Sequence, residues 1–246
     1  MNERSLIDNI LNGIVVYETV RIYDGKPLAV KEHYKRLINS LSYLGREDEV
    51  SLNDFEKEIE RNISFDRVKI YAIVSDKVEL YSVGENILTK RIESIKIDIS
   101  NVRHADPSSI PPNFKSLSRA DVFLARQNKG DNYDVILLGQ KGQVCEGSFS
   151  NVFLIKDGKV ITPSLESGIL EGITRTFVID MLKENGYTVE EKIVEVKELF
   201  YADEIFLTHT SMGIVPVNYL GKFSLKTEIS EKLSRMFEEY LHAKIG

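Results

Sequence analysis

The sequence lacks several features that would point to particular protein classes. Among 246 residues there is one cysteine and no tryptophan. The single cysteine, Cys145, excludes an internal disulfide, and the four histidines are scattered without the spacing of metal ligands. We therefore expect a reducing, cytoplasmic setting and no metal site.

Long apolar runs and basic stripes are also missing. Residues 1–13 contain too short and too interrupted an apolar run for a signal peptide, and no later window is long enough to cross a bilayer. The net charge is −6, with acidic and basic residues interspersed, so no basic patch favours a phosphate backbone. We expect neither a membrane nor a nucleic acid as a partner.

The first part of the chain contains strand and helix patterns in alternation. Residues 13–30 predict a hairpin that turns at Asp24-Gly25, because this pair favours positive φ. Residues 31–45 predict a helix from apolar residues at helical spacing, and residues 66–83 predict a second hairpin. With a strand predicted at residues 94–100, these elements indicate an antiparallel sheet with helices on one side.

Residues 101–114, NVRHADPSSIPPNF, suit neither a helix nor a strand, because they include three prolines and two serines. We interpret this stretch as an interdomain linker. The predicted organisation is a smaller N-terminal domain (1–102), a linker (103–114) and a larger C-terminal domain (115–246). The predicted fold class is α+β.

The C-terminal part continues with mixed patterns, including an Asp-Gly hairpin at residues 157 and 158. Helices are predicted at 116–128, 173–185 and from about 228, and strands at 133–138, 150–155, 188–196, 204–209 and 214–218.

Lys115 stands three residues after Pro112 and directly before the helix predicted at 116–128. Pro111 and Pro112 disfavour helical backbone in the residues that precede them, so the helix begins after them. Ser116 or Ser118 can cap it, which places Lys115 at a fixed junction. Most lysines are solvated surface residues, so this position alone assigns no role.

Three further stretches carry polar groups at the ends of predicted elements. In CEGSFSNVFLI (145–155), Glu146 precedes an apolar strand. Gly172 opens a helix whose first amides, from Ile173 and Thr174, are free donors of the kind that bind phosphate. In residues 206–217 a strand breaks at Thr-His-Thr-Ser, whose hydroxyls and amides could hold an anion. Taken singly, these are also ordinary features of a solvated loop or a helix end.

Together with Arg36, the four stretches supply the parts of a pyridoxal phosphate enzyme. Such an enzyme needs a lysine for the Schiff base with the cofactor aldehyde, and a helix N-terminus and an arginine for the phosphate. It also needs a carboxylate that stabilises the protonated pyridine nitrogen. Lys115, Arg36 and Glu146 are the candidates.

The order of motifs resembles the class IV aminotransferases, which are fold type IV pyridoxal phosphate enzymes. This family includes branched-chain aminotransferases, D-amino acid aminotransferases and aminodeoxychorismate lyases. The resemblance spans nearly the whole chain, and five motifs in order are more specific than any one. The motifs are H-x-x-R-L (33–37), K-S-L (115–117), E-G-S-x-S-N-V-F (146–153), G-I-T-R (172–175) and T-S-x-x-I-x-P-V (210–217).

The resemblance implies a two-domain fold like that of D-amino acid aminotransferases, pyridoxal 5′-phosphate as cofactor, and a homodimer. It implies that Lys115 carries the cofactor and shuttles the proton, and that Glu146 pairs with the pyridine nitrogen. The phosphate contacts would come from Arg36, the backbone amides of Ile173 and Thr174, and Thr210. The substrate contacts would come from Tyr17, Ser211 and Met212.

Some positions depart from the family pattern. The chain keeps Tyr17 and Glu18 without the usual glycine-rich lead before them, and residues 69–83 contain no Arg-x-His pair to bind a substrate carboxylate. Arg103-His104 in the linker is a candidate replacement. Ala120 stands where branched-chain enzymes place a tyrosine, and residues 210–217 also resemble those of the lyases. The substrate therefore stays open.

We expect amino group transfer between an amino acid, of the branched-chain or D-amino acid type, and a 2-oxo acid such as 2-oxoglutarate. The alternative within the family is an aminodeoxychorismate lyase that gives 4-aminobenzoate and pyruvate. A thiol hydrolase built on Cys145 and His209 is disfavoured, because the adjacent carboxylate of Glu146 opposes thiolate formation. A silent binding module is disfavoured because lysine, arginine and glutamate are all retained.

Overall fold

The protein is described from a computed structural model, which describes residue 7, residues 15–87 and residues 95–245. The chain forms two compact units by its backbone contacts. Unit 1 is Met1–Thr89 with Asn113–Arg119, and unit 2 is Lys90–Pro112 with Ala120–Gly246. The domain division at 102 and 115 stays a prediction, and the borders of the compact units differ from it.

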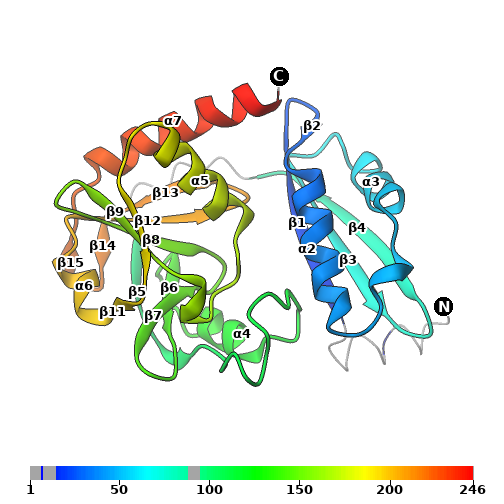
Figure 1. The fold of residues 1–246 in the computed structure, drawn as a ribbon, viewed down its shortest axis with the longest axis horizontal. Helices are drawn as coiled ribbons and strands as arrows, with labels where there is room; N and C mark the ends of the chain where they lie inside the picture. Colours follow the sequence, from blue (N-terminus) through cyan, green and yellow to red (C-terminus); the bar gives the residue numbers. More distant parts are fainter. Residues whose placement is uncertain (1–6, 8–14, 88–94, 246) are drawn as a thin grey trace. The chain divides into compact units, whose positions relative to one another are not determined.

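Unit 1 is an antiparallel sheet with strand order β2-β1-β3-β4. Figure 1 shows its helices α2 and α3 beside the sheet. The predicted hairpins and the predicted helix are confirmed for their described residues; residues 13, 14 and 94 lie outside them, as do residues 1–6 and 8–12 of the N-terminal segment. The elements are β1 (Val15–Tyr23), β2 (Lys26–Pro27), α2 (Val30–Ser42), η1 (Glu47–Glu49), α3 (Leu52–Glu60), β3 (Arg67–Val74) and β4 (Val78–Glu85).

The first hairpin turns where the sequence predicts it. Asp24 and Gly25 both have positive φ, 47° and 75°, which matches the right-handed twist of the two strands that they join. Asp157 and Gly158 repeat this conformation with φ of 49° and 76°. Both Asp-Gly predictions are therefore confirmed.

The core of unit 1 lies on one face of the sheet, because alternate strand residues point to the same side. The inward set includes Val16 and Val20 of β1 and Ile70 of β3, which pack against Leu37 of α2 and Phe55 of α3. Helices α2 and α3 therefore cover the same face; α3 has no predicted counterpart.

Residues 113–119 add to the edge of the unit 1 sheet. Tyr17 donates its amide to the carbonyl of Lys115 at 3.1 Å, and Leu117 donates to the carbonyl of Val15 at 3.0 Å. The predicted helix at 116–128 is therefore too long: helix α4 spans Ala120–Gln127. The reason is that residues 115–117 pair with β1, and Ser116 accepts from the amide of Ser118 at 3.1 Å in a local turn.

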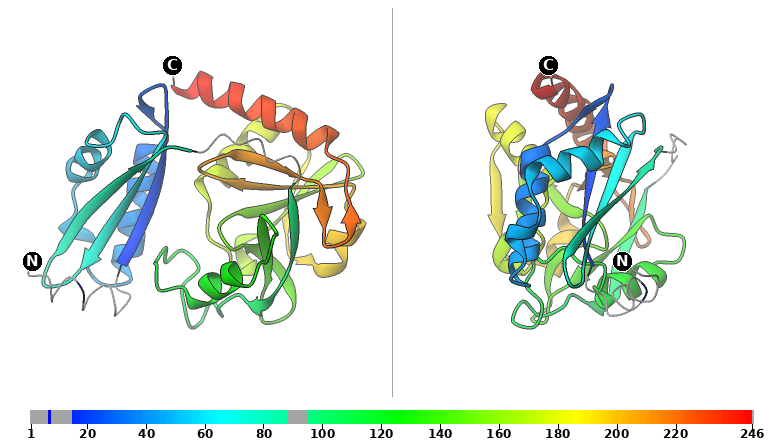
Figure 2. Two further views of the ribbon diagram at one scale, coloured as in Figure 1. Left: turned by 180° about the vertical axis from the view of Figure 1, so that it is seen from behind. Right: turned by 90° about the vertical axis from the view of Figure 1, so that its right-hand side faces the viewer.

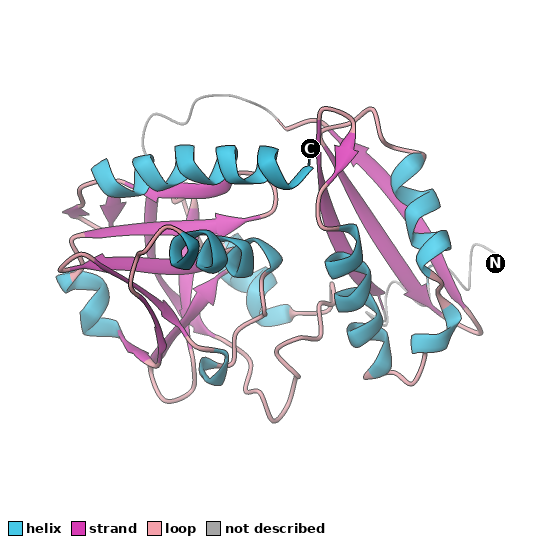
Figure 3. Ribbon diagram, turned by 45° about the horizontal axis from the view of Figure 1, so that its top comes forward, coloured by secondary structure: helices cyan, strands magenta, loops and turns pink. Residues whose placement is uncertain are grey.

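Unit 2 contains a five-stranded sheet, β10-β9-β8-β12-β13, and a six-stranded sheet, β11-β7-β6-β5-β14-β15. Its helices α5 and α7 pack against β12 of the five-stranded sheet, and α4 packs against β5 and β6 of the six-stranded one (Figures 1 and 3). The strands are β5 (Lys96–Arg103), β6 (Asp134–Leu138), β7 (Gln143–Gly147), β8 (Asn151–Lys156), β9 (Lys159–Pro163), β10 (Val189–Lys192), β11 (Val194–Glu195), β12 (Glu204–His209), β13 (Gly213–Val217), β14 (Tyr219–Leu220) and β15 (Phe223–Ser224). The helices are α4, η2 (Leu165–Ser167), α5 (Ile173–Glu184), α6 (Val196–Tyr201) and α7 (Glu228–Ile245).

The main core of unit 2 lies between its two sheets. Ile97 and Ile136 of the six-stranded sheet and Leu154 and Leu207 of the five-stranded sheet belong to one buried cluster. Neighbouring residues of β6 point the other way, and Leu137 packs under α4. Strand β6 is buried on both faces, which explains its continuous apolar run. Mixed helices and sheets confirm the predicted α+β class.

The sequence patterns miss several short elements of unit 2. Strand β7, helix α6 and the two-residue strands β14 and β15 have no predicted counterpart. The placement of the strand predicted at 94–100 in the first antiparallel sheet is wrong: β5 pairs parallel with β6 in unit 2 and continues to Arg103 inside the predicted linker. Strand β7 escapes prediction because its residues, QVCEG, mix polar and small types. Figure 2 shows the elements of both units from two further sides. In the part of the chain that the structure describes, no helix has the length and apolar character needed to span a membrane.

Candidate active site

The predicted site residues of unit 1 gather around the start of β1. Lys115 is held there through its backbone, which accepts from the Tyr17 amide and donates to the Ser40 hydroxyl at 3.2 Å. Its Nζ atom lies 4.5 Å from the centroid of the Tyr17 ring, a distance typical of a cation–π contact. The structure therefore brings together Lys115 and Tyr17, two residues predicted from the sequence.

Next to Tyr17, Glu18 forms a buried charge cluster with helix α2. The guanidinium of Arg36 donates from Nε to Oε1 and from Nη2 to Oε2, both at 2.7 Å, and the Nδ1 atom of His33 lies 2.7 Å from Oε2. Glu18 is fully buried. His33 and Arg36 reach one carboxylate because they are three residues apart on the same helix face.

The charge cluster shifts the pKa values of its members. Burial alone would raise the pKa of Glu18, but the charge and hydrogen bonds of Arg36, with those of His33, hold it well below its usual range. Burial lowers the pKa of His33, and the positive charges of Arg36 and Lys115 act in the same direction against the effect of Glu18. Lys115 is thus close enough for its charge to act on His33.

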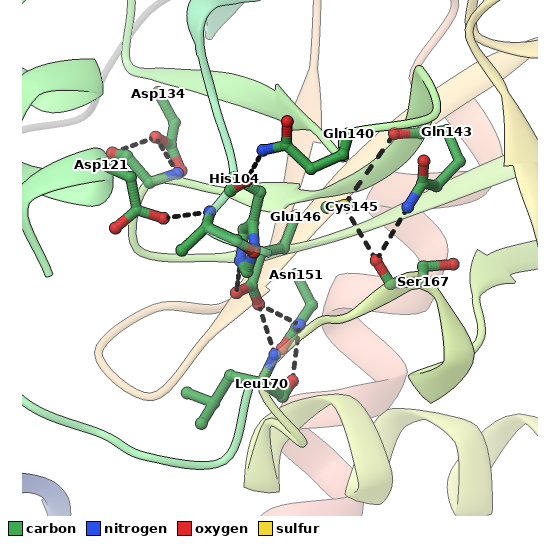
Figure 4. Close-up of polar contacts among 12 residues, drawn as sticks. His104, Asp121, Asp134, Gln140, Gln143, Cys145, Glu146, Asn151, Ser167 and Leu170 are labelled. Atoms are coloured by element: carbon green, nitrogen blue, oxygen red, sulfur yellow. Dashed lines mark hydrogen bonds and ion pairs between the residues drawn. The ribbon is translucent and has the colours of Figure 1, made fainter. Parts of the chain in front are cut away.

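In unit 2, Glu146 lies on β7 with its carboxylate held by three groups (Figure 4). Oε1 lies 3.0 Å from Nε2 of His104, while Oε2 accepts from Nδ2 of Asn151 at 3.1 Å and from the amide of Leu170 at 3.2 Å. The Glu146 side chain keeps 10% of its surface exposed. The carboxylate is therefore fixed in orientation without being sealed off.

The turn that follows Glu146 is shaped by a second buried carboxylate, Asp134 on β6. Its Oδ1 accepts from the amide and the hydroxyl of Ser148 at 2.9 and 2.6 Å, and its Oδ2 accepts from the hydroxyl of Ser150 at 2.6 Å. A side chain at Gly147 would collide with Asp134 and Ser150, so only glycine fits there. Burial raises the pKa of Asp134 even though these hydrogen bonds lower it.

The first residues of α5 lie close to Asn151. Gly172 precedes the helix and provides no side-chain cap, and a Cβ atom added to Gly172 would collide with Oδ1 of Asn151. The structure thus brings the predicted helix N-terminus, with Ile173 and Thr174, to the same place as the residue that holds Glu146.

A buried hydroxyl at the end of β12 lacks a partner. Thr208 is opposite Asn151 in the pairing of β12 with β8, and its Oγ1 atom is buried with no hydrogen-bond partner within the described residues. Buried polar groups are nearly always bonded, so the Thr208 hydroxyl has a hydrogen bond left to make with water or a ligand.

Thr210, Ser211 and Met212 form the turn between β12 and β13. Met212 donates its amide to the carbonyl of His209 at 3.3 Å, and Gly213 completes the turn with φ of 64°. Ser211 is buried, whereas Met212 is 41% exposed. The turn follows β12, whose Thr208 is paired with Asn151, so these predicted residues belong to the same end of the sheet as Asn151.

Several contacts of the site could not be read from the sequence. Asn151 and His33 stand inside recognised motifs, but their pairing with Glu146 and Glu18 depends on the fold. His104, a candidate for binding the substrate carboxylate, has its ring buried against Glu146. The Nη1 atom of Arg103, the other residue of that pair, donates to the carbonyl of Gly139 at 3.4 Å.

The geometry does not support a Cys–His hydrolase. Cys145 is buried and its thiol donates to the carbonyl of Ser167 at 3.0 Å, while Nε2 of His209 lies 2.7 Å from the hydroxyl of Tyr133. Within residues 7, 15–87 and 95–245, no three or more His, Cys, Asp or Glu side chains are grouped to hold a metal ion.

Comparisons with known proteins agree with the motif order. Residues 15–220 match the family described as amino-transferase class IV. A Thermotoga maritima protein named probable branched-chain-amino-acid aminotransferase is 44% identical, over 96% of this chain and 89% of its own. A protein of the same name from Aquifex aeolicus is 34% identical, over 95% of this chain and 85% of its own.

A solved structure gives the same result. The crystal structure of a Thermotoga maritima protein with a similar name matches with a TM-score of 0.92 and 42% identity, and the match covers 98% of this chain and 90% of that one. The family match, the relatives and the fold agree. The chain belongs to the class IV aminotransferases, which are enzymes that use pyridoxal 5′-phosphate.

Proposed function

We propose that this aminotransferase acts on branched-chain amino acids, with 2-oxoglutarate as the acceptor. The observation that carries the substrate class is the 44% identity, over nearly the full chain, to a relative named for branched-chain amino acids. D-Amino acids are the second substrate class, because D-alanine aminotransferases are among the more distant relatives.

The residues present fit the cofactor. Unit 2 presents a carboxylate with fixed orientation at Glu146, a helix N-terminus without a side-chain cap at Gly172, and an orphaned buried hydroxyl at Thr208. These are groups that a protonated ring nitrogen and a phosphate require. When bound, pyridoxal 5′-phosphate supplies an electron sink for the carbanion that forms at the substrate's α-carbon.

In this proposal Lys115 holds the cofactor covalently and then moves the proton at the substrate's α-carbon through its Nζ atom. Glu146 pairs with the pyridine nitrogen and keeps it protonated. The backbone of Lys115, bonded to Tyr17 and Ser40, fixes the point from which the side chain reaches the cofactor.

The phosphate contacts are assigned to α5 and its surroundings. The backbone amides of Ile173 and Thr174 point out of the helix N-terminus, where the helix dipole favours an anion. Thr210 and Arg36 complete the proposed set. Arg36 already binds Glu18 through two nitrogens, so it would contribute mainly a positive charge of fixed position. Tyr17, Ser211 and Met212 are proposed as substrate contacts.

Lys115→Ala tests the assignment of the lysine. The wild-type protein loaded with pyridoxal 5′-phosphate and reduced with borohydride should carry the label on the peptide that contains Lys115, as read by mass spectrometry. The variant should carry none and should lose turnover. Lys69→Ala is the matched control: this lysine lies in the same unit and pairs with Glu85, so its loss should leave label and turnover in place. Labelling of another residue would exclude the assignment.

The substrate proposal is tested with a panel of L- and D-amino acids and 2-oxoglutarate. We expect glutamate to form fastest with the L-forms of leucine, isoleucine and valine. Preference for D-amino acids would replace the branched-chain assignment with the second class. Aminodeoxychorismate lyase is an alternative because one of the more distant relatives has this activity. Pyruvate release from aminodeoxychorismate without glutamate formation in the panel would establish it.

We infer that the protein acts as a homodimer in the cytoplasm. Support for the dimer comes from helix α4, where Phe123 is 59% and Leu124 is 49% exposed. Phe149, in the turn after Glu146, is 38% exposed. Large apolar side chains in such positions are typical of an interface. The single buried cysteine agrees with a reducing compartment.

A further inference from the structure

His104 is a buried residue whose side chain no step of the proposed function uses. It follows the last residue of β5 and is 2% exposed. Its ring points at Glu146, as Figure 4 shows. A buried histidine that faces a carboxylate of the site either only packs in the core or also fixes the orientation of that carboxylate.

The backbone around His104 is held on three sides. Its amide donates to the carbonyl of Leu138 at 3.0 Å, and its carbonyl accepts from the side chain of Gln140 at 2.8 Å. The next amide, that of Ala105, donates to Asp121 of α4 at 2.7 Å. The backbone from which the imidazole extends is therefore held by β6, by the turn after it and by α4.

Both ring nitrogens of His104 face oxygen atoms. Nδ1 lies 3.1 Å from the carbonyl of Ala105, which can only accept, and Nε2 lies 3.0 Å from Oε1 of Glu146. A proton on Nε2 turns the second contact into a hydrogen bond to the carboxylate, and together with a proton on Nδ1 it makes His104 an imidazolium that donates at both contacts. Without that proton, two lone pairs would face each other in a buried site, unless Glu146 itself carried the proton.

The contact with His104 completes the set of donors around Glu146. Asn151 and the amide of Leu170 both donate to Oε2, whereas the contact at Oε1 is with Nε2 of His104. Donors on both oxygens fix the rotation of the carboxylate group as well as its position. Donors on Oε2 alone would leave the carboxylate group able to rotate, so that the position of Oε1 would not be fixed.

We propose that His104 is a positioning residue for Glu146. His104 donates a hydrogen bond from Nε2–H to Oε1 of Glu146 and so aims the carboxylate at the pyridine nitrogen of the cofactor. The inference rests on the proposed role of Glu146. It adds that the pairing of Glu146 with the ring nitrogen depends on a histidine from a different part of the chain.

The first test uses the protein without cofactor. In apoprotein labelled with 15N-histidine, two-dimensional NMR reports which ring nitrogens carry protons, and His104→Gln identifies the signals that belong to His104. We expect Nε2 of His104 to be protonated. A bare Nε2 would overturn the proposal, because Nε2 would then have no proton to donate to Glu146.

The second test separates positioning from a structural role. Apoprotein is titrated with pyridoxal 5′-phosphate and with its 1-deaza analogue, whose ring carries CH in place of the nitrogen. His104→Leu should weaken binding of the cofactor about tenfold and binding of the analogue hardly at all, because the analogue offers Glu146 no partner. Equal weakening of both would assign His104 a structural role only and would overturn the proposal.

Two matched variants complete the design. His104→Gln places an amide donor where Nε2 lies, and it should restore cofactor affinity to within about threefold of the wild type. Asp121→Ala removes the hydrogen bond to Ala105 without touching Glu146; it should lower the melting temperature and leave the ratio of the two affinities unchanged. Failure of the Gln variant to restore affinity would count against the donor role.

The outcomes also distinguish this inference from the proposed function. If the wild-type protein binds cofactor and analogue equally well, the role of Glu146 fails. The NMR experiment still reports separately whether Nε2 of His104 carries a proton. If the wild type binds the cofactor more tightly than the analogue, and His104→Leu shows the same ratio of affinities, the role of Glu146 stands and the role of His104 fails.

Discussion

Arg36 and Glu18 form a bidentate ion pair in unit 1, with Nε on Oε1 and Nη2 on Oε2, each at 2.7 Å. Glu18 has no exposed surface and His33 shares its Oε2. An intact buried ion pair adds little to the free energy of unfolding. Removing one partner lowers that free energy strongly, because the other charge is left buried and uncompensated.

Glu18→Gln should lower the free energy of unfolding of the apoprotein by about 3–5 kcal/mol at pH 7. The pKa of Glu18 in the folded protein lies below its ordinary value of 4.5. Its contribution to stability is therefore complete above pH 4.5 and is lost as the pH falls through the folded pKa. Urea unfolding of both proteins at a series of pH values should show their difference shrink on acidification.

The control for this prediction is Glu60→Gln, an exposed glutamate at the end of α3. It should change stability by less than about 0.5 kcal/mol at pH 7. A difference between wild type and Glu18→Gln that stays constant or grows as the pH falls below 4.5 would contradict the lowered pKa.

Asp134→Asn should show the opposite pH dependence. The pKa of Asp134 is raised above 3.8 by burial, so the folded protein favours the protonated carboxyl. Its contribution is present below pH 3.8 and is lost as the pH rises through the folded pKa. The stability of the wild type relative to the variant should therefore increase on acidification. At neutral pH we expect the variant to be less stable by about 1–3 kcal/mol, because an amide nitrogen cannot accept from Ser148 or Ser150.

The same unfolding assay thus compares how the stability contributions of Glu18 and Asp134 change with pH. Glu18 is surrounded by cations, whereas Asp134 is surrounded by neutral donors. Equal slopes for the two differences would mean that burial, rather than the charge of the neighbours, decides both pKa values.

Gly172→Ala should weaken the affinity of the apoprotein for pyridoxal 5′-phosphate about tenfold. The φ angle at Gly172 is −73°, which alanine adopts without strain, so the effect comes from the collision of the new Cβ with Asn151. Absorbance titration measures the affinity. Gly186→Ala at the other end of α5 is the control: at φ of 78° with open space around it, it should cost about 1–2 kcal/mol of stability and leave affinity unchanged.

Phe123→Glu should convert the proposed dimer to a monomer, because it places a charge in an apolar surface of α4. Sedimentation velocity gives the mass of each species. Tyr201→Glu on α6, where the replaced side chain is 70% exposed, should leave the dimer intact. A wild-type protein that sediments as a monomer, or a Phe123→Glu variant that still sediments as a dimer, would show that α4 is not the interface.

Much of the fold could be predicted because its signals are local. The Asp-Gly turns at 24 and 157 depend on the φ preferences of two residues, and strand β6 can be predicted from its apolar run. The structure departs from prediction where partners distant in sequence decide. Residues 116 and 117 look like the start of a helix, yet a bond between Leu117 and Val15, 102 positions away, holds them extended.

The candidate site shows the same division. Lys115, Glu146 and Arg36 are visible in the sequence because their residue types suit the cofactor and their motifs occur in order. Their supports are not visible: His104 lies 42 positions from Glu146, and nothing local in the sequence couples them. Chemistry that resides in one side chain can be predicted, whereas chemistry that depends on a neighbour requires the fold.

The strip formed by residues 115–117 also protects the protein from association. Strand β1 has β3 on one side, and its other side would be an open edge apart from the two pairs that it makes with β2 at Ile22 and Tyr23. Lys115 and Leu117 occupy the opposite end of that edge, at Val15 and Tyr17. An exposed strand edge is a template for pairing with other chains. The segment that carries the candidate catalytic amine therefore also covers part of a strand edge that other chains could otherwise pair with.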